Sequence, residues 1–386
     1  MRKPSRICIA PDSFKGALDA AGVARAIAEG FRGSLPDAEF RLVPMADGGE
    51  GTVDAWLSAV TGAQRMSATV QDPLGRPVEA AFAYLPGRAI AVIEMAAASG
   101  LPLLAPSERN PLATSTFGTG ELLRRALDLG AQEIILGIGG SATNDAGTGM
   151  ATALGARFLD EDGAPLPPGG AALARLSRID LAGFDPRVRS IRLRVACDVT
   201  NPLCGPKGAS RVFGPQKGAT PDDVATLDAA LAHLAGIVAA QLGLPADYVD
   251  TPGSGAAGGL GFGLLAFCRA KLQRGVGIVA DSVGLAGKMR GCDLVVTGEG
   301  RIDAQTPNGK TPAGVAAVAR QLGVPAIAIC GCTGAGWEAV REIGIREVFP
   351  VTQGRFDPAH PEDGAYERVF LCARDVAKRL FGGEPA

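Results

Sequence analysis

The side chains of this sequence that could do chemistry gather in five polar loops, each of which follows an apolar run typical of a buried β-strand. In an open parallel sheet, ligands bind at the loops that leave the carboxyl ends of the strands. These loops are therefore the candidate site. They are APDSFKG (Ala10 to Gly16), PMADGGEGT (Pro44 to Thr52), GIGGSATND (Gly137 to Asp145), the run from Ala196 to Ala219 and the run from Val295 to Thr311.

The five loops supply Asp, Lys, Arg, Ser, Thr and Asn side chains, but they contain no histidine. The only two histidines of the chain, His233 and His360, are isolated. Acyl transfer by a Ser-His-Asp or Cys-His site is excluded, because it needs an imidazole beside the nucleophile. The groups that remain for catalysis are glycine-rich backbone, carboxylates that could bind Mg²⁺, and Lys or Arg side chains that could stabilise developing charge. These groups are the equipment of phosphoryl transfer.

Each loop also has a purely structural interpretation as a turn, an Asx turn or the start of a helix. These interpretations apply to Asp47–Gly49 with Glu50, to Asp12 with Ser13, and to Asp198 with Asn201. The run Asn308 to Thr311 looks like the end of a Walker A motif, but Ala304 stands where that motif needs its first glycine. A true P-loop is therefore not expected. Five such loops in one chain are harder to explain as turns than one.

The first residues of the loop GIGGSATND also allow a different interpretation, as a dinucleotide-binding motif. Gly137-x-Gly139-x-x-Ala142 fits the dinucleotide-binding pattern, and Asp160 follows at the separation of a ribose-binding acid. Against a nicotinamide or flavin cofactor, the run ARFL before Asp160 is short for a central strand. The pair Asn144-Asp145 also stands where the first turn of the helix would pack on the cofactor.

The composition bounds the class of protein. Lys+Arg 38 against Asp+Glu 40 gives a net charge of -2, so we expect neither nucleic acid nor a membrane surface as a partner. The longest uncharged stretch, 251–268, is too short for a membrane span. The eight cysteines are scattered, without a signal peptide or zinc-ligand spacing at Cys330 and Cys332. We therefore expect a cytoplasmic protein.

The elements that must position the loops follow a repeated order of helix, glycine and short apolar strand. One helix with an apolar stripe ends before Gly62, and another ends before Gly323 and the strand VPAIAIC. Such units predict an α/β fold with a largely parallel sheet. Both ends of the chain follow this order, whereas the middle has Pro-rich turns and antiparallel strands around Phe82 to Met95. We expect a doubly wound domain from residues 1–64 plus 291–386, with 65–290 inserted as a second α/β domain.

Taken together, the loop motifs resemble the bacterial glycerate kinase family, the type associated with glycerate and glucarate breakdown. The motifs that carry the resemblance cover essentially the whole chain: PDSFKG, ADGGEGT, GGSATNDAGTGM, CDVTNPLCGPKGAS, VFGPQKGA, GSGAAGGLGFG and TGEGRIDAQTPNGKTP. The resemblance implies phosphorylation of D-glycerate at the 2-hydroxyl with ATP and Mg²⁺. It also implies a Rossmann-like or flavodoxin-like domain joined to a second domain of restriction-enzyme-like topology.

On this basis we assign hypothetical roles on the substrate side. A small anionic substrate needs a cation and loop donors around its carboxylate, for which the candidates are Ser13, Lys15, Arg301, Lys310 and Asn144. The reacting hydroxyl needs a nearby carboxylate, for which Asp198 and Asp303 are the candidates. We count Lys15 with them as a catalytic residue.

The nucleotide side has its own candidates. Asp47 and Glu50 are expected to engage Mg²⁺. The groups expected to hold the nucleotide are Gly139, Gly140, Ser141, Thr143, Lys207 and Lys217. Three alternatives stay open: another small hydroxy acid as substrate, the 3-hydroxyl as acceptor, and a non-catalytic sugar-acid sensor. A homo-oligomer is possible.

Overall fold

The computed structural model describes residues 3–351 and 364–382, so His360 lies outside the described residues. By their internal contacts the residues form two units. Unit 1 contains the described parts of Met1–Asp47, Asp54–Thr61 and Arg274–Ala386, and unit 2 contains Gly48–Val53 and Gly62–Gln273. The second boundary expected from the sequence, at 290/291, differs because α9 (Gly275–Ser282) and α10 (Leu285–Met289) pack against elements of unit 1.

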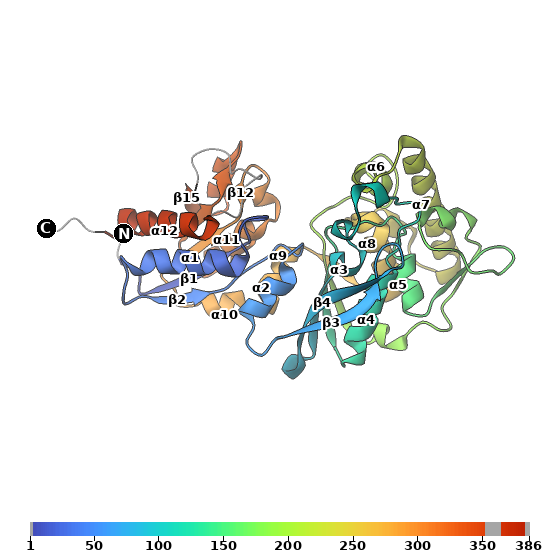
Figure 1. Ribbon diagram of the computed structural model, residues 1–386, viewed down its shortest axis with the longest axis horizontal. Helices are drawn as coiled ribbons and strands as arrows, with labels where there is room; N and C mark the ends of the chain where they lie inside the picture. The colour runs from blue at the N-terminus through green and yellow to red at the C-terminus, as the bar shows by residue number, and fades with distance from the viewer. Residues whose placement is uncertain (1–2, 352–363, 383–386) are drawn as a thin grey trace. The chain divides into compact units, whose positions relative to one another are not determined.

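Unit 1 is built on a five-stranded, fully parallel sheet (Figure 1). Its strands, in spatial order, are β15 (Ile345–Pro350), β13 (Ala326–Cys330), β11 (Leu294–Gly298), β1 (Arg6–Pro11) and β2 (Glu39–Leu42). Numbered along this unit alone, the order is 2-1-3-4-5 from the opposite edge. The chain changes direction across the sheet between β1 and β11, and such a switch point leaves a crevice at the carboxyl ends of the strands.

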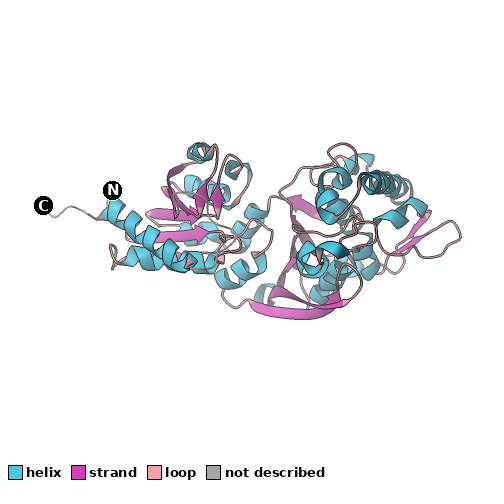
Figure 2. Cartoon of the chain, turned by 45° about the horizontal axis from the view of Figure 1, so that its top comes forward, coloured by secondary structure: helices cyan, strands magenta, loops and turns pink. Residues whose placement is uncertain are grey.

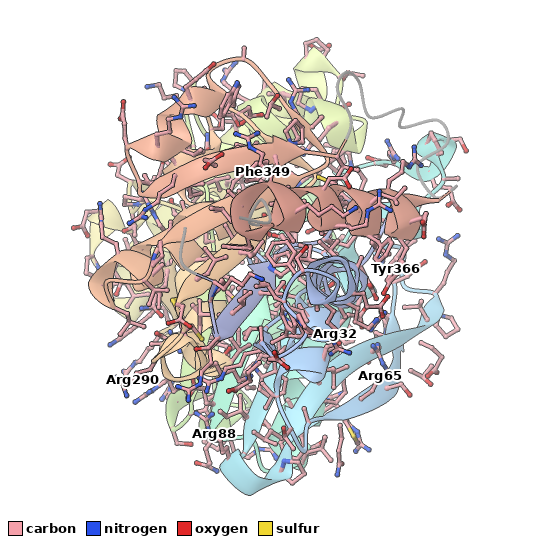
Figure 3. All side chains as sticks on the ribbon, turned by 90° about the vertical axis from the view of Figure 1, so that its left-hand side faces the viewer. Arg32, Arg65, Arg88, Arg290, Phe349 and Tyr366 are labelled. Carbon is pink, nitrogen blue, oxygen red and sulfur yellow. The ribbon has the colours of Figure 1, made fainter. Side chains whose placement is uncertain are left out.

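Helices cover both faces of this sheet (Figure 2). Successive residues of a strand point to opposite faces, and β11 and β13 are buried at every residue, so both faces need cover. Ile327 and Ile329 pack in one core with α1 (Ala20–Arg32) and α12 (Ala365–Phe381), whereas Ala328 and Cys330 pack in another with α11 (Thr311–Gln321). Phe349 of β15 belongs to the first core and lies beside α12 (Figure 3). The unit also holds most of α2 (Thr52–Ala59) and the short pair β12 (Arg301–Ile302) and β14 (Cys332–Thr333).

Unit 2 is built on a six-stranded mixed sheet. In spatial order its strands are β10 (Lys271–Gln273), β9 (Arg192–Ala196), β6 (Glu133–Gly137), β5 (Ile90–Glu94), β4 (Pro77–Leu85) and β3 (Gln64–Gln71). The first four run parallel, and β4 and β3 are antiparallel to their neighbours. The antiparallel strands expected around Phe82 to Met95 are therefore confirmed.

Six helices pack in unit 2: α3 (Ala96–Ser99), α4 (Phe117–Asp128), α5 (Thr148–Ala153), α6 (Ala209–Phe213), α7 (Pro221–Leu242) and α8 (Ala256–Cys268). Among the described residues, α7 is the one helix long and apolar enough to cross a membrane by length and composition. Core helices of water-soluble proteins have the same properties, and Leu227, Leu231 and Leu234 of α7 are fully buried in the core of unit 2.

The segment after the loop GIGGSATND does not continue as a dinucleotide-binding unit. The strand β7 (Arg157–Leu159) pairs with β8 (Arg178–Asp180), antiparallel, in a two-stranded sheet separate from the six-stranded one. A dinucleotide fingerprint requires a strand–helix–strand unit whose second strand joins the same parallel sheet. Asp160 therefore lacks the position of a ribose-binding acid.

Candidate active site

Three carboxyl groups follow neighbouring parallel strands at the carboxyl edge of the unit 1 sheet. Asp12 comes directly after β1, Glu299 directly after β11, and Asp47 after the stretch that continues β2 alongside β1. Asp12 and Glu299 thus stand on the two strands that form the switch point. The predicted loops that follow β1, β2 and β11 converge here because parallel strands end at one edge.

Asp12 is buried and accepts hydrogen bonds on both carboxylate oxygens. Ser13 donates its backbone N–H to Oδ1 over 2.7 Å, and the hydroxyl of Thr311 donates to Oδ2. Burial, and then the nearby charge of Asp47, raises the pKa of Asp12 to about 6. The helix α1 is capped by Asp19 instead, whose Oδ1 accepts from the N–H of Gly22. Capping therefore does not explain Asp12 and Ser13.

Glu299 is the second buried carboxyl of this edge. Thr306 donates its hydroxyl to Oε1 over 2.6 Å, and the Lys310 ammonium lies 3.7 Å from the same oxygen. Burial raises the pKa of Glu299 to about 7, although Thr306 and Lys310 oppose the shift. This carboxyl therefore changes its charge near neutral pH.

Several residues predicted from the sequence lie around these carboxyls. The Lys310 ammonium is 3.4 Å from Asp303 Oδ1, and Arg301 Nε is 3.6 Å from Asp303 Oδ2. Lys15 is exposed, and its charge lowers the pKa of Asp12. Unit 1 therefore brings together acidic and basic groups from the loops after β1, β2 and β11.

In unit 2, Asp145 organises the loop GIGGSATND from within. It is fully buried, and its Oδ2 accepts from the backbone N–H and the hydroxyl of Thr116 over 2.8 and 2.9 Å. Its two oxygens also accept from the N–H groups of Gly147 and Gly149. Burial raises the pKa of this carboxyl despite these donors. Asp145 therefore fixes the shape of the loop.

Lys217 fixes the preceding part of the same loop. Its ammonium donates to Ser141 Oγ over 2.8 Å and to the Thr143 carbonyl over 2.6 Å, and the side chain is only 1% exposed. Burial lowers the pKa of Lys217 to about 7. From the sequence, Lys217 was expected to contact nucleotide phosphates. The structure instead directs its ammonium into the protein, because the loop surrounds it.

Asn144 and Thr143 leave polar atoms without partners. Asn144 is buried and donates Nδ2 to Ser210 Oγ over 2.9 Å. Its Oδ1 and the hydroxyl of Thr143 are buried without a hydrogen-bond partner among the described residues. Buried polar atoms are nearly always satisfied in native proteins, so these two indicate a place for water or a ligand.

The motif GSGAAGGLGFG brings the backbone of α8 against this loop. A Cβ on Gly258 would lie 1.9 Å from the Thr143 carbonyl oxygen, and one on Gly263 would lie 2.3 Å from that of Ala146. Gly258 has φ +66°, a left-handed conformation that glycine adopts without strain. These glycines therefore serve close packing behind the loop.

The segment Gly48–Val53 runs over the carboxyl edge of the unit 2 sheet. The N–H of Val53 donates to Glu94 Oε1 over 2.7 Å, and a Cβ on Gly137 would lie 2.3 Å from the Gly48 carbonyl oxygen. Glu50 is exposed on this segment. It belongs to unit 2, whereas Asp47 belongs to unit 1.

The loop after β9 places the last predicted residues at the surface. Asp198 and Lys207 are exposed. Asn201 donates Nδ2 to the carbonyl of Lys207 over 2.8 Å, which closes the loop on itself. Gly139 and Gly140 are exposed at the end of β6. Exposure leaves all four positions accessible to a ligand.

A model of the "Glycerate kinase family" matches residues 7–380, nearly the whole chain. The chain belongs to this family. The "Glycerate kinase" of Halalkalibacterium halodurans is 54% identical over 89% of this chain and 90% of its own. The "Glycerate 2-kinase" of Escherichia coli K12 is 48% identical over 97% and 98%. A solved structure described as glycerate kinase 2 of Salmonella typhimurium LT2 has a TM-score of 0.89, with 47% identity over 98% of each chain.

As a member of the glycerate kinase family, the chain has an α/β fold with parallel sheets, in agreement with this solved structure. No role was predicted from the sequence for Asp12, Glu299 or Ser210, and Asp145 was expected to face the ligand together with Asn144. Asp12 and Glu299 could have been found, because each is the first acidic residue after a predicted strand. Burial of Asp145 and the partner of Ser210 depend on tertiary packing, which no local pattern reveals.

Proposed function

We propose that this chain catalyses the ATP-dependent phosphorylation of D-glycerate to 2-phosphoglycerate. The observation that carries the proposal is the match to the glycerate kinase family over residues 7–380, joined to the acidic and basic groups at the unit 1 sheet edge. The acceptor position follows the relative named "Glycerate 2-kinase", which this chain covers almost completely.

On the substrate side, we assign the glycerate carboxylate to Lys15, Arg301 and Lys310, with Ser13 as a hydroxyl donor. Arginine and lysine hold carboxylates by charge-assisted hydrogen bonds. Asp303 lies within ion-pair distance of both Arg301 and Lys310, which supports its place beside the substrate. Asp303 and Asp198 remain the candidates to accept the proton of the hydroxyl. Glu299 joins them, since a general base works best when its pKa lies near the operating pH.

On the nucleotide side, backbone N–H groups at Gly139 and Gly140 and the exposed Lys207 are our candidates for the phosphates. Ser141, Thr143 and Asn144 line the same loop. Lys217 acts as a positioning residue in this proposal, because its ammonium holds Ser141 and Thr143. Preorganised donors of this kind stabilise the charge that develops in phosphoryl transfer.

Mg²⁺ is usually held by one or two carboxylates together with substrate phosphates. The described residues contain no group of three or more ligating side chains that would form a complete protein cage. Asp12 and Asp47 fit the smaller requirement, since the charge of Asp47 reaches Asp12 at the ends of adjacent strands. We therefore assign the ion to Asp47 with Asp12, and Glu50 is a weaker candidate. When bound, the ion would neutralise phosphate charge.

We also propose the finer fold assignment. The strand order 2-1-3-4-5 of unit 1 supports a flavodoxin-like, doubly wound domain made from both chain ends. Unit 2 is then the inserted domain, of restriction-enzyme-like topology. Eight free cysteines support a cytoplasmic location.

The decisive experiment is a coupled assay of ADP release with D-glycerate and a panel of other small hydroxy acids, followed by NMR of the product. We expect turnover with D-glycerate and phosphate on its 2-hydroxyl. A phosphate on the 3-hydroxyl, or faster turnover of another acid, would overturn the substrate or acceptor assignment. Binding of glycerate without ADP release would show a sensor instead.

A further inference from the structure

The sheet of unit 1 has a second cleft at its other edge, where β13 and β15 begin and α11 ends (Figure 1 labels α11 and β15). Its volume is about 420 Å³, which is in the range of small-molecule sites. The residues that line it include Ala319, Arg320, Val324, Arg341, Ile345 and Arg346. The strands β11 and β13 run parallel, and Glu299 follows the end of β11. Glu299 and its neighbours therefore lie at the opposite end of the strands from this cleft.

Three arginines from three different elements line this cleft. Arg320 lies in the last turn of α11, Arg341 ends the 3-10 helix Trp337–Arg341, and Arg346 lies near the start of β15. All three are exposed, and no acidic side chain of the described residues lines the cleft. Within residues 3–351 and 364–382, none of the three forms an ion pair. Among the residues that the structure describes, the cleft is therefore a concentration of positive charge without a paired carboxylate.

The neighbouring carboxylates do not neutralise this charge. Glu347 is the residue after Arg346, but its Oε2 lies 3.2 Å from Arg379. Glu342 follows Arg341 and does not line the cleft. The Arg341 guanidinium instead stands 5.3 Å from the ring centroid of Trp337, where a cation–π contact holds it.

Stabilisation of the carboxyl end of α11 explains only one of the three arginines. A basic residue in the last turn of a helix interacts favourably with the helix dipole, which accounts for Arg320. The last carbonyls of α11 already accept from the N–H groups of Leu322 and Val324. Neither Arg341 nor Arg346 belongs to this helix. The contact with Trp337 accounts for the orientation of Arg341 but leaves its charge unpaired, and neither this contact nor the helix dipole accounts for Arg346.

The floor of the cleft suits an organic ligand. Gly323 and Gly344 turn the chain at its rim, and a Cβ on either would meet open space. Between them, the partly exposed side chains of Val324 and Pro325 present apolar surface. We propose that this cleft binds a small organic phosphate. The arginines hold the phosphate by bidentate, charge-assisted hydrogen bonds, and the carbon chain packs on the apolar floor.

The test is calorimetric titration of the full chain with phosphoglycolate as the probe. We compare wild type with Arg320→Gln/Arg341→Gln/Arg346→Gln, and use Arg290→Gln as the matched control, since Arg290 is an exposed arginine of the same unit (Figure 3). Loss of three charged hydrogen-bond donors should weaken binding by at least about tenfold. The control should bind as wild type does.

A second variant separates this cleft from the carboxyl-edge site, which also has phosphate-binding groups. Lys310→Met should leave the binding at the arginine cleft intact. Retention of wild-type affinity in the triple variant, or loss of binding in Lys310→Met alone, would overturn the proposal. Equal affinity for inorganic phosphate would remove the role of the apolar floor.

Trp337 gives an independent readout, because its ring lies beside Arg341. Phosphoglycolate should change the tryptophan fluorescence of wild type and of Arg290→Gln. It should not change that of Trp337→Phe, which keeps only Trp56. If the triple variant does not fold, as checked by circular dichroism, Arg346→Gln alone should weaken binding about threefold or more. Unchanged affinity in this single variant would then count against the site. These measurements do not use turnover, so they hold whether or not the proposed kinase activity does.

Discussion

Asp12 and Glu299 are carboxyl groups that the fold keeps out of water and near other carboxyl groups. Their hydrogen bonds from Thr311 and Thr306 favour the charged forms, but burial outweighs these donors in both cases. A folded protein does not keep two such groups for stability alone, since apolar residues would fill the space at lower cost. Their place at the switch point supports a part in binding or catalysis.

The first prediction concerns the pH dependence of stability at Glu299. Its folded pKa of about 7 lies above the ordinary 4.5, so the folded state binds the proton more tightly than the unfolded state. The resulting stabilisation is complete below about pH 4.5 and is lost as pH rises through 7. In Glu299→Gln this loss should disappear. The variant should gain about 1–3 kcal/mol relative to wild type between pH 4.5 and 7.

Urea unfolding of both proteins in metal-free buffer at several pH values measures this difference. Glu338→Gln is the control, because Glu338 is exposed on the same unit. A constant difference between Glu299→Gln and wild type across this pH range would show that Glu299 titrates normally.

The second prediction concerns Asp198, which the structure leaves exposed after β9. If it accepts the proton of the hydroxyl or binds the metal, Asp198→Asn should lower turnover by at least about 100-fold, because a positioned proton acceptor contributes this much. The measurement is kcat in the coupled assay, with Asp162→Asn as an exposed control. Turnover within a few-fold of wild type would assign the role to Asp303 or Glu299.

At this scale the sequence predicts which loops carry polar groups, but it does not predict their exposure. Lys217 looks like any other lysine of a glycine-rich loop, yet its ammonium is enclosed by Ser141 and Thr143. Arg301, Asp303 and Lys310 are close in sequence, and the structure places them in contact. Contacts between distant segments, such as Asp12 with Thr311, depend on the strand order and are not encoded locally.

Among the elements, α8 has a tight steric constraint, because its backbone contacts the loop GIGGSATND. The third prediction is that Gly258→Ala destabilises the protein severely. A Cβ would overlap the Thr143 carbonyl at 1.9 Å, and the left-handed φ adds strain. We expect a loss of more than about 3 kcal/mol in urea unfolding.

Gly277→Ala is the matched control for this change. Gly277 lies in the exposed part of α9, where an added Cβ meets open space. Alanine should stabilise this helix by about 0.5–1 kcal/mol. If both variants had the same stability, close packing at Gly258 would not be the cause.

Element types were predictable where a glycine stops an amphipathic helix. Gly130 and Gly323 both have positive φ directly before the strands expected after them. The segment Trp337–Arg341 forms only a short 3-10 helix, since Gly336 and Gly344 leave room for only a few residues between them. The pairing of β1 with β11 could not be derived from local pattern, because it joins the two ends of the chain.

At the scale of the whole molecule, each unit has a hydrophobic core of its own. The fourth prediction is that the units unfold separately, because cores of this size are cooperative by themselves. Both tryptophans, Trp56 and Trp337, belong to unit 1, so their fluorescence reports that unit alone. Circular dichroism reports both units. The two urea transitions should therefore not coincide.

This measurement needs a control for the fluorescence assignment. Trp337→Phe should keep the same fluorescence midpoint, now reported by Trp56, whose Nε1 donates to Ser282 in the same unit. Coincident fluorescence and circular dichroism transitions in both proteins would mean that the chain unfolds as one cooperative body.

The pairing of β1 with β11 also sets the order in which the chain can fold during its synthesis. Thr297 of β11 donates to the carbonyl of Ala10 in β1, and the two residues are 287 positions apart. At the usual speed of translation, β1 waits about 15 to 60 s for this partner. The whole sheet of unit 2 leaves the ribosome in that interval. The apolar strand Ile7 to Ala10, made long before β11, is among the last to be enclosed, and it is a natural segment for a chaperone to hold.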